Sequence, residues 1–249
     1  MQKNSHFPRF VRAGHHKNLS YLIMQMVGPN LDYLRKQCNR RKFSLATAHH
    51  LAYQCLEALQ ALHLENLIHR DIRPSHFAIG STAFDCRNVY ILDYHLVRRF
   101  TRKDGQVRPA RHKVRTKGCF KYASPNSLKN QDISRPDDLY SWFYMNIEFL
   151  KGRLPWRRLK NKADILHVKL SNIDDLLNDL PKQWSKIFKS VSKLTFEQDP
   201  PYYEYKSLIF EVINQENISF DEPFDWELGG ESYSNFSEPL AVYLRMPSK

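Results

Sequence analysis

Two aspartates, Asp71 and Asp93, are the residues of this sequence with the clearest potential for chemistry. Asp71 lies in the run LIHRDIRPSHFAIG at residues 67–80, and Asp93 directly follows the apolar run VYIL at residues 89–92. A carboxylate on a loop can accept the proton of a hydroxyl group, and a carboxylate at a strand end can bind a metal ion that bridges nucleotide phosphates. The sequence therefore offers Asp71 as a general base and Asp93 as a metal ligand.

The elements that position these aspartates follow from the spacing of apolar residues. Ser44 is the expected N-cap of a helix that runs to about residue 66 and leads into the Asp71 loop. Its apolar residues recur every three or four positions: Leu51, Cys55, Leu59 and Leu62. Two short strands are then expected at 77–79 and 89–92, with a polar turn between them.

The first part of the chain predicts two strands, at 10–14 and 21–26, because β-branched and aromatic residues flank a polar turn. The run VGPN at residues 27–30 should break the second strand and could form a hinge. A helix with Leu31 and Leu34 on one face is expected to follow.

Helices dominate the rest of the chain. Residues 137–150 are apolar nearly all round, which predicts a buried central helix capped by Gly152. Amphipathic helices are expected at 174–180, 183–194 and 203–213. Residues 228–249 have the composition of a tail, in which 240–244 could dock back as a strand.

Composition narrows the class of protein and its partners. With 42% hydrophobic residues among 249, the chain can form a sizeable core, and no run approaches the roughly 20 apolar residues of a membrane span. A formal net charge of +12 favours acidic partners. The four cysteines show no metal-binding spacing, so we expect reduced thiols and a cytoplasmic, or else nuclear, protein.

Once these blocks are placed, the chain resembles the casein kinase I group of serine/threonine protein kinases and, within it, the tau-tubulin kinase-like branch. The blocks that carry the resemblance are HRDIRPSHFA at 69–78, KYAS at 121–124, RPDDLYS at 135–141, GRLPWR at 152–157 and PFDWE at 223–227. They extend over nearly the whole chain, about residues 10–227.

The resemblance implies an α+β protein-kinase-like fold, with a mostly helical large lobe under a truncated β small lobe. We expect residues 1–28 to be the remnant of the small lobe and hinge, 29–227 the large lobe and 228–249 a tail. The Gly-rich loop, the strand lysine and the helical glutamate of the family have no equivalent in this chain.

Several residues depart from the family pattern around the two aspartates. Arg73 replaces a lysine that contacts the transferred phosphate, and it keeps the charge on a wider, planar group. His76 replaces an asparagine that ligates a second metal, which should weaken magnesium binding. We expect His76 itself to be a partly exposed loop residue. His95 stands where the family has the glycine after its metal-binding aspartate.

Four further residues are assigned by the resemblance to structural support of the site: His69, Arg70, Cys119 and Asp138. Asp138 should accept backbone N–H groups of the loop that carries Asp71. Cys119 replaces a hydroxyl residue, and because a thiol is a weak donor and acceptor, its link to Asp71 should be weaker.

The irregular stretch between residues 98 and 121 is strongly basic and contains Asp104 as its one acidic residue. In the casein kinase I group, basic residues near this position are associated with phosphorylated or acidic substrates, and guanidinium groups suit such anions. The expected anion-binding residues are Arg98, Arg99, Arg108, Arg111, Arg115 and Lys117. A mobile positive loop without a fixed ligand is the alternative.

Two functions follow. The first is an inactive or weakly active kinase-fold protein that binds acidic or phosphorylated protein, because several contacts needed for catalysis are altered together. The second is an active ATP-dependent protein serine/threonine kinase whose N-terminal lobe is missing from this chain. ATP and Mg²⁺ are its expected cofactors, whereas the first function needs none. Nucleic acid is a less favoured partner.

Overall fold

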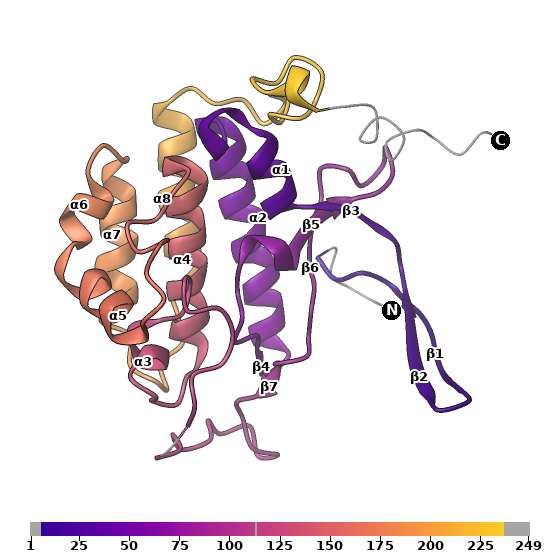
Figure 1. Cartoon of the computed structure of the whole chain (residues 1–249), viewed down its shortest axis with the longest axis vertical. Coiled ribbons are helices and arrows are strands. Elements are labelled where there is room, and N and C mark those ends of the chain that lie inside the picture. Colours follow the sequence, from indigo (N-terminus) through magenta and orange to yellow (C-terminus); the bar gives the residue numbers. More distant parts are fainter. Residues whose placement is uncertain (1–5, 113, 237–249) are drawn as a thin grey trace.

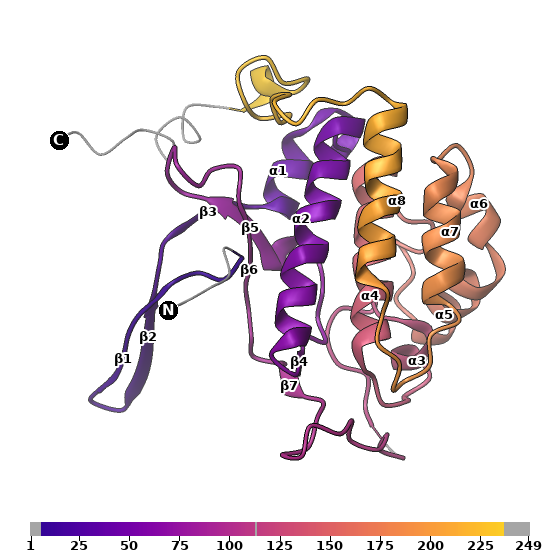
Figure 2. The ribbon, with the colours of Figure 1, turned by 180° about the vertical axis from the view of Figure 1, so that it is seen from behind.

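Two long helices, α2 (Leu45–Leu64) and α4 (Arg135–Lys151), run side by side through the molecule (Figure 1). The computed structural model describes residues 6–112 and 114–236. Helix α8 (Tyr202–Gln215) packs along α2, as the view from behind shows (Figure 2). The shorter helices are α1 (Leu31–Gln37), α3 (Pro125–Leu128), α5 (Lys162–Ser171), α6 (Ile173–Leu177) and α7 (Lys182–Val191).

Helix α2 begins where the sequence predicts. The hydroxyl of Ser44 accepts the N–H of Thr47 at 3.2 Å and so satisfies one donor of the first turn. The helix ends at Leu64, and Asn66 takes a left-handed conformation with φ of 62° that turns the chain into the Asp71 loop. The predicted helix is confirmed.

Helix α4 is buried along almost its whole length, which confirms the prediction of a central helix. At its start, the Asp137 carboxylate accepts the N–H of Ser134 at 2.8 Å. At its end, Gly152 has φ of 76° and donates its N–H to the carbonyl of Glu148 at 2.8 Å. A left-handed residue at this position favours glycine.

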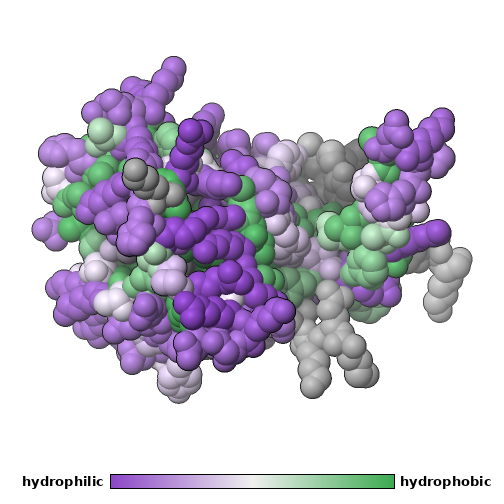
Figure 3. All heavy atoms as spheres, turned by 90° about the horizontal axis from the view of Figure 1, so that it is seen from below, coloured by the Kyte–Doolittle hydropathy of each residue, from purple (hydrophilic) through white to green (hydrophobic). Residues whose placement is uncertain are grey.

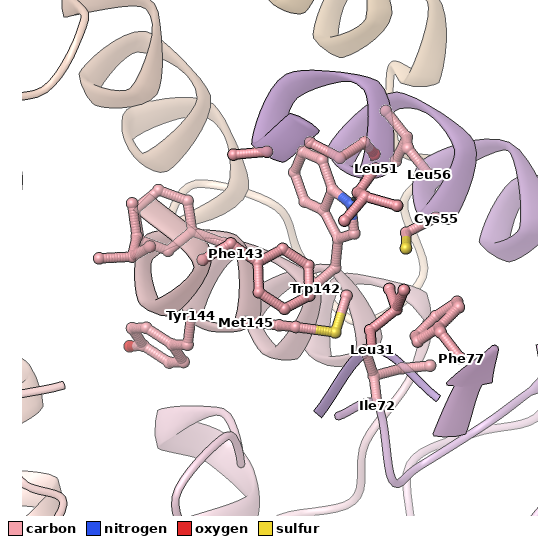
Figure 4. Close-up of a cluster of buried hydrophobic side chains, with 14 of the residues drawn as sticks. Leu31, Leu51, Cys55, Leu56, Ile72, Phe77, Trp142, Phe143, Tyr144 and Met145 are labelled. Atoms are coloured by element: carbon pink, nitrogen blue, oxygen red, sulfur yellow. Dashed lines mark hydrogen bonds between the residues drawn. The ribbon is translucent and has the colours of Figure 1, made fainter. Parts of the chain in front are cut away.

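The core lies between α4 and α2 (Figure 4). Trp142 of α4 points toward Leu51 of α2, while Ile72 and Phe77 approach from the segment around Asp71 (Figure 4). All four of these side chains are buried. The indole Nε1 of Trp142 donates to the carbonyl of Ala52 at 3.1 Å, so its polar atom is satisfied inside the core.

A three-stranded antiparallel sheet covers one side of α2, with β5 (Phe77–Gly80) between β3 (Val27–Asn30) and β6 (Val89–Ile91). This arrangement confirms the strands predicted at 77–79 and 89–92. The second strand ends at Met24, which confirms that it breaks before residues 27–30, but these residues form a strand of their own, which was not predicted, and pair with β5 across an irregular register. Gly28 permits the close approach: a Cβ there would lie 2.6 Å from the carbonyl oxygen of Gly80.

A separate hairpin of β1 (Phe10–His16) and β2 (Leu19–Met24) projects from the body of the molecule (Figure 1). Both predicted strands are present, with shifted ends. Apolar side chains gather on the projecting hairpin (Figure 3). The exposed ones of the hairpin and the residues after it are Phe10, Val11, Leu19, Leu22, Ile23, Met24 and Met26.

The remaining predicted helices correspond to α6, α7 and α8, with ends that differ by a few residues. Helix α5 was not predicted from the sequence. It begins at an Asn161 cap, but only Ile165 and Lys169 are fully buried along it, so its apolar pattern is weak. Among the described residues, no helix is long and apolar enough to cross a membrane.

The last described residues pack against the large helical part. Ser232 is buried and donates its N–H to the carbonyl of Asp225 at 3.1 Å. The side-chain amide of Asn235 donates to the carbonyl of Gln37 at 3.1 Å. Short 3-10 helices lie at Asn39–Arg41, Pro74–His76 and Tyr233–Asn235. The strand predicted at 240–244 lies outside the described residues.

Candidate active site

The loop that carries Asp71 is held by one buried carboxylate. The N–H of His69 reaches Oδ2 of Asp138 at 2.7 Å, and the N–H of Arg70 reaches Oδ1 at 2.8 Å. Burial alone would raise the pKa of Asp138, but hydrogen bonding from His63 and the neighbouring positive charge lower it overall. The contact expected between Asp138 and this loop is therefore present.

His69 and Arg70 tie the same loop to the chain around Asp93. The short strand β4 (Leu67–Ile68) directly precedes the Asp71 loop, and the short strand β7 (Arg98–Arg99) follows the segment around Asp93. These two strands pair with each other. Nε2 of His69 lies 2.9 Å from the carbonyl of Leu92, and Nε of Arg70 donates to the carbonyl of Leu96 at 2.6 Å. Both predicted support residues thus link the two halves of the site.

Asp71 is buried at the centre of this arrangement, 7% exposed. Its Oδ1 accepts the backbone N–H of Cys119 at 2.8 Å, and its Oδ2 lies 3.4 Å from Nε of Arg73. Gly118 has φ of 74°, and a Cβ there would lie 2.6 Å from Oδ1 of Asp71. The contact between Cys119 and Asp71 is made by the backbone amide of Cys119. The weak hydrogen bonding of the Cys119 thiol therefore does not affect this contact.

Asp93 lies next to two imidazoles. Its Oδ2 is 3.1 Å from Nε2 of His76, and its Oδ1 contacts Nδ1 of His95. Burial alone would raise the pKa of Asp93, but the hydrogen bond from His95 and the nearby His76 lower it overall. Asp93 has φ of 63°, a left-handed conformation that aspartate tolerates better than most residues.

His76 joins the two aspartates into one site. Its Nδ1 lies 3.7 Å from Oδ2 of Asp71, on the opposite side of the ring from its contact with Asp93. The expectation of a partly exposed loop residue is wrong, because His76 is 4% exposed. The sequence could not show the burial of His76, since its ring lies between two segments of the chain, one with Asp71 and one with Asp93. Burial and the charge of Arg73 lower the pKa of His76.

The residues present do not fit a magnesium ion held between these two segments. Magnesium prefers oxygen ligands in near-octahedral geometry. Oδ2 of Asp93 faces an imidazole, its Oδ1 is engaged by His95, and the oxygens of Asp71 are engaged by Cys119 and Arg73.

The predicted anion-binding residues do not form a single free cluster. Arg98 and Arg111 both bind the buried carboxylate of Asp132, at 3.0 Å and 2.8 Å. Nε of Arg108 donates to the carbonyl of Thr101 at 2.8 Å. The other three predicted residues, Arg99, Arg115 and Lys117, are exposed. The sequence interpretation missed Asp132 because this partner lies outside the basic stretch and no motif marks it.

A basic hollow of ≈ 410 Å³ opens beside the Asp71 loop. Its lining includes Arg73, Pro74 and Ser75 from that loop. Two carboxylates, Asp32 and Glu148, and seven further cations also line it: Arg35, Lys36, Arg40, Arg41, Lys121, Arg153 and Arg157. The sequence analysis did not predict this hollow, because its cations come from four segments, around residues 35–41, 73, 121 and 153–157, that only the fold brings together.

Comparison with known proteins agrees with this geometry. Residues 3–217 match the sequence model of the protein kinase domain. The chain belongs to the protein kinase family. The predicted α+β kinase-like fold is therefore confirmed, with Asp71 and Asp93 of this kinase domain flanking one imidazole.

Three named relatives indicate which kinases this domain is similar to. It is 40% identical to a probable serine/threonine-protein kinase of Dictyostelium discoideum, over 88% of this chain and 45% of that protein. It is 35% identical to the serine/threonine-protein kinase spe-6 of Caenorhabditis elegans, over 89% of this chain and 60% of that protein. It is 32% identical to casein kinase I homolog 2 of Saccharomyces cerevisiae, over 82% of this chain and 39% of that protein.

These relatives confirm the predicted resemblance to serine/threonine kinases of the casein kinase I group. The narrower assignment to the tau-tubulin kinase-like branch stays a prediction. The kinase domain spans roughly half the length of the curated relatives it matches, from 39% to 60% of these three.

Proposed function

We propose that this protein is a kinase-fold binding module for acidic or phosphorylated protein, with little or no phosphoryl-transfer activity. The observation that carries the proposal is the basic hollow next to Asp71. A substrate hydroxyl near Asp71 would place the flanking residues of its peptide within reach of these cations. Acidic or phosphorylated side chains are the complementary ligands.

The hollow contains cations of two kinds. Lys36 is paired with Asp32 at 2.6 Å, and Lys121 is paired with Glu148 at 2.5 Å. Four others have no carboxylate within ion-pair distance in the described part of the chain, and all are exposed: Arg40, Arg41, Arg153 and Arg157. An anionic ligand would supply the negatively charged partner that these four guanidinium groups lack.

A buried arginine, Arg35, joins two turns of the backbone at the rim of the hollow. Arg35 is buried and donates from Nη1 to the carbonyl of Arg41 at 2.8 Å and to the carbonyl of Gly152 at 3.2 Å. A Cβ on Gly152 would lie 2.6 Å from the carbonyl oxygen of Arg40, so glycine lets the two turns meet. The guanidinium groups are thus mounted on a fixed backbone, which reduces the entropy cost of binding.

The low activity in this proposal rests on the Asp93 side of the site. Both oxygens of its carboxylate face imidazoles, and His76 stands where the family has an asparagine that ligates a second metal. Losing a single electrostatic contact to the transition state reduces the rate by roughly 10²-fold or more.

Binding of a phosphoserine peptide, measured by fluorescence anisotropy, tests the proposal. The peptide should bind at least about tenfold more tightly than its unphosphorylated serine form, with affinity that falls as salt rises. The double variant Arg40→Gln/Arg153→Gln should lose this preference. Arg158→Gln is the matched control, because Arg158 is an exposed neighbour that does not line the hollow. Equal binding of both peptides would contradict the proposal.

A second candidate function is an active ATP-dependent serine/threonine kinase, of which this chain is one part. The exposed apolar hairpin of β1 and β2 favours it, since side chains such as Leu22 and Ile23 would be buried if further strands covered them. MgATP should then raise the melting temperature of the protein. Phosphate transfer to casein that Asp71→Asn abolishes would establish this second function and overturn the first.

A further inference from the structure

We propose that the protein binds two anionic groups of one ligand at once, one in the basic hollow and one in a second hollow beside it, and so selects multiply phosphorylated segments of protein. This inference rests on the proposed function, since the basic hollow takes the first anion. The second hollow has a volume of ≈ 470 Å³. Its charged lining residues come from three segments of the chain: Arg40, Lys42, Lys151, Arg153 and Asp179.

Two arginines join the two hollows. Arg40 and Arg153 line both of them, so the hollows meet at these side chains. A guanidinium group has five N–H donors in a planar fork, so each of these two groups has enough donors for an anion on either side. Once a ligand has placed its first anion, a second anion on the same molecule reaches the neighbouring hollow at a high effective concentration.

The backbone at Arg40 and Arg41 has a conformation that arginine rarely adopts. Their φ angles are 55° and 57°, in the left-handed region that favours glycine and asparagine. The carbonyl of Arg41 accepts from Nη1 of Arg35 at 2.8 Å, which holds this turn in place. Just after the turn, the N–H of Phe43 donates to the carbonyl of Phe149 at 2.9 Å. Strained residues of this kind cluster at ligand sites, and here the strain directs two arginines to the hollows.

The second hollow has an excess of positive charge. Lys42 is exposed and has no carboxylate within ion-pair distance in the described part of the chain. Nζ of Lys151 donates to three backbone carbonyls at the end of α6, at 2.7–3.2 Å. Because carbonyls carry no net charge, the ammonium charge of Lys151 is not neutralised by these contacts. Asp179 is the one acidic residue that lines this hollow, so its four cations outnumber its carboxylates.

Fluorescence anisotropy of the whole chain with synthetic phosphoserine peptides tests the inference. One peptide carries a single phosphoserine, and three others carry two phosphoserines separated by one, three or five residues, which span about 7, 13 and 20 Å when extended. At one separation, the second phosphate should tighten binding by at least about tenfold. The gain should be smaller at the other separations, because the two hollows have a fixed distance between them.

Two variants of the second hollow should change the affinity ratio of the doubly to the singly phosphorylated peptide in opposite directions. Lys42→Gln should reduce this ratio to near one, because it removes a cation that lines the second hollow alone. Asp179→Asn should raise the ratio by about twofold or more, because it removes a like charge from beside the second phosphate. Asp179 has φ of 61°, which asparagine also tolerates, so this replacement preserves the backbone.

Lys129→Gln is the matched control, because Lys129 is an exposed lysine that lines neither hollow. This variant should leave the affinity ratio unchanged, and circular dichroism checks that every variant folds. A ratio that Lys42→Gln and Asp179→Asn both leave unaltered would show that the second phosphate does not occupy the second hollow. An equal gain at all three separations would reflect total charge alone and would also contradict the inference.

The same measurements separate this inference from the proposed function. If the singly phosphorylated peptide binds more tightly than its serine form but the second phosphate adds less than about threefold at every separation, only the two-hollow inference is wrong. If the singly phosphorylated peptide shows no such preference, the proposed function fails and the two-hollow inference fails with it.

Discussion

Oδ2 of Asp138, in the first turn of α4, accepts the backbone N–H of His69 at 2.7 Å. The carboxylate is fully buried and also contacts Nε2 of His63 at 3.0 Å. Because a buried carboxylate without partners is unfavourable, this relationship binds the central helix and the Asp71 loop to each other. The geometry of the candidate site is therefore a property of the helical core as well as of the loop.

Replacing Asp138 should destabilise the whole domain. Asp138→Ala leaves the N–H groups of His69 and Arg70 buried without an acceptor, and we expect the free energy of unfolding to fall by about 3 kcal/mol or more. Urea unfolding measures the change. Asp174→Ala, at an exposed position of α6, should change it by less than about 0.5 kcal/mol. Equal effects of the two variants would show that the buried carboxylate is not needed.

The core between α4 and α2 should depend strongly on Trp142. Trp142→Ala removes a fully buried side chain and should lower the free energy of unfolding by about 3–5 kcal/mol. Trp142→Phe keeps much of the volume and should cost less. Thermal and urea unfolding give both values, and a Trp142→Ala protein as stable as the Phe variant would contradict the packing in Figure 4.

Asp132 should make stability depend on pH under acidic conditions. Burial alone would raise the pKa of this carboxyl, but the hydrogen bonds from Arg111 and Arg98 lower it well below its usual range. The stabilisation is therefore fully present above the unfolded pKa of about 3.9 and is lost as pH falls through the lower folded pKa. Asp132→Asn should remove that part of the pH dependence, measured by urea unfolding between about pH 5 and pH 2.

The same variant should loosen the basic stretch after β7. Arg98 and Arg111 lose their shared partner in Asp132→Asn, so we expect faster tryptic cleavage between them at neutral pH. Cleavage after Arg158, which has no such partner in the described part of the chain, provides the comparison. An unchanged ratio of the two rates would show that Asp132 does not hold this segment.

The hairpin of β1 and β2 should promote self-association. It exposes a contiguous set of apolar side chains, and its strand edges are open. Leu22→Lys should reduce the concentration-dependent increase in sedimentation coefficient. Tyr203→Lys is the matched control, because Tyr203 is 81% exposed yet lies away from the hairpin on α8. A wild-type protein that stays monomeric at high concentration would contradict this expectation.

Local sequence patterns predicted most elements of the fold. Ser44 and Gly152 mark a helix start and a helix end because capping needs only a hydroxyl or a left-handed residue at one position. The strand at residues 27–30 was missed because Val27 pairs with Gly80, which lies 53 residues later in the chain. Helix α5 was missed because few of its residues are buried.

The sequence by itself determined the kinase family and the two aspartates at the centre of the candidate site, since these depend on residue types at short, regular spacing. Only the tertiary structure decided that His76 is buried between Asp71 and Asp93, that Asp132 neutralises two predicted anion-binding arginines, and that other arginines line a hollow. Contacts of this kind join segments far apart in the chain, and their charges and burial are set by packing, which no local pattern encodes.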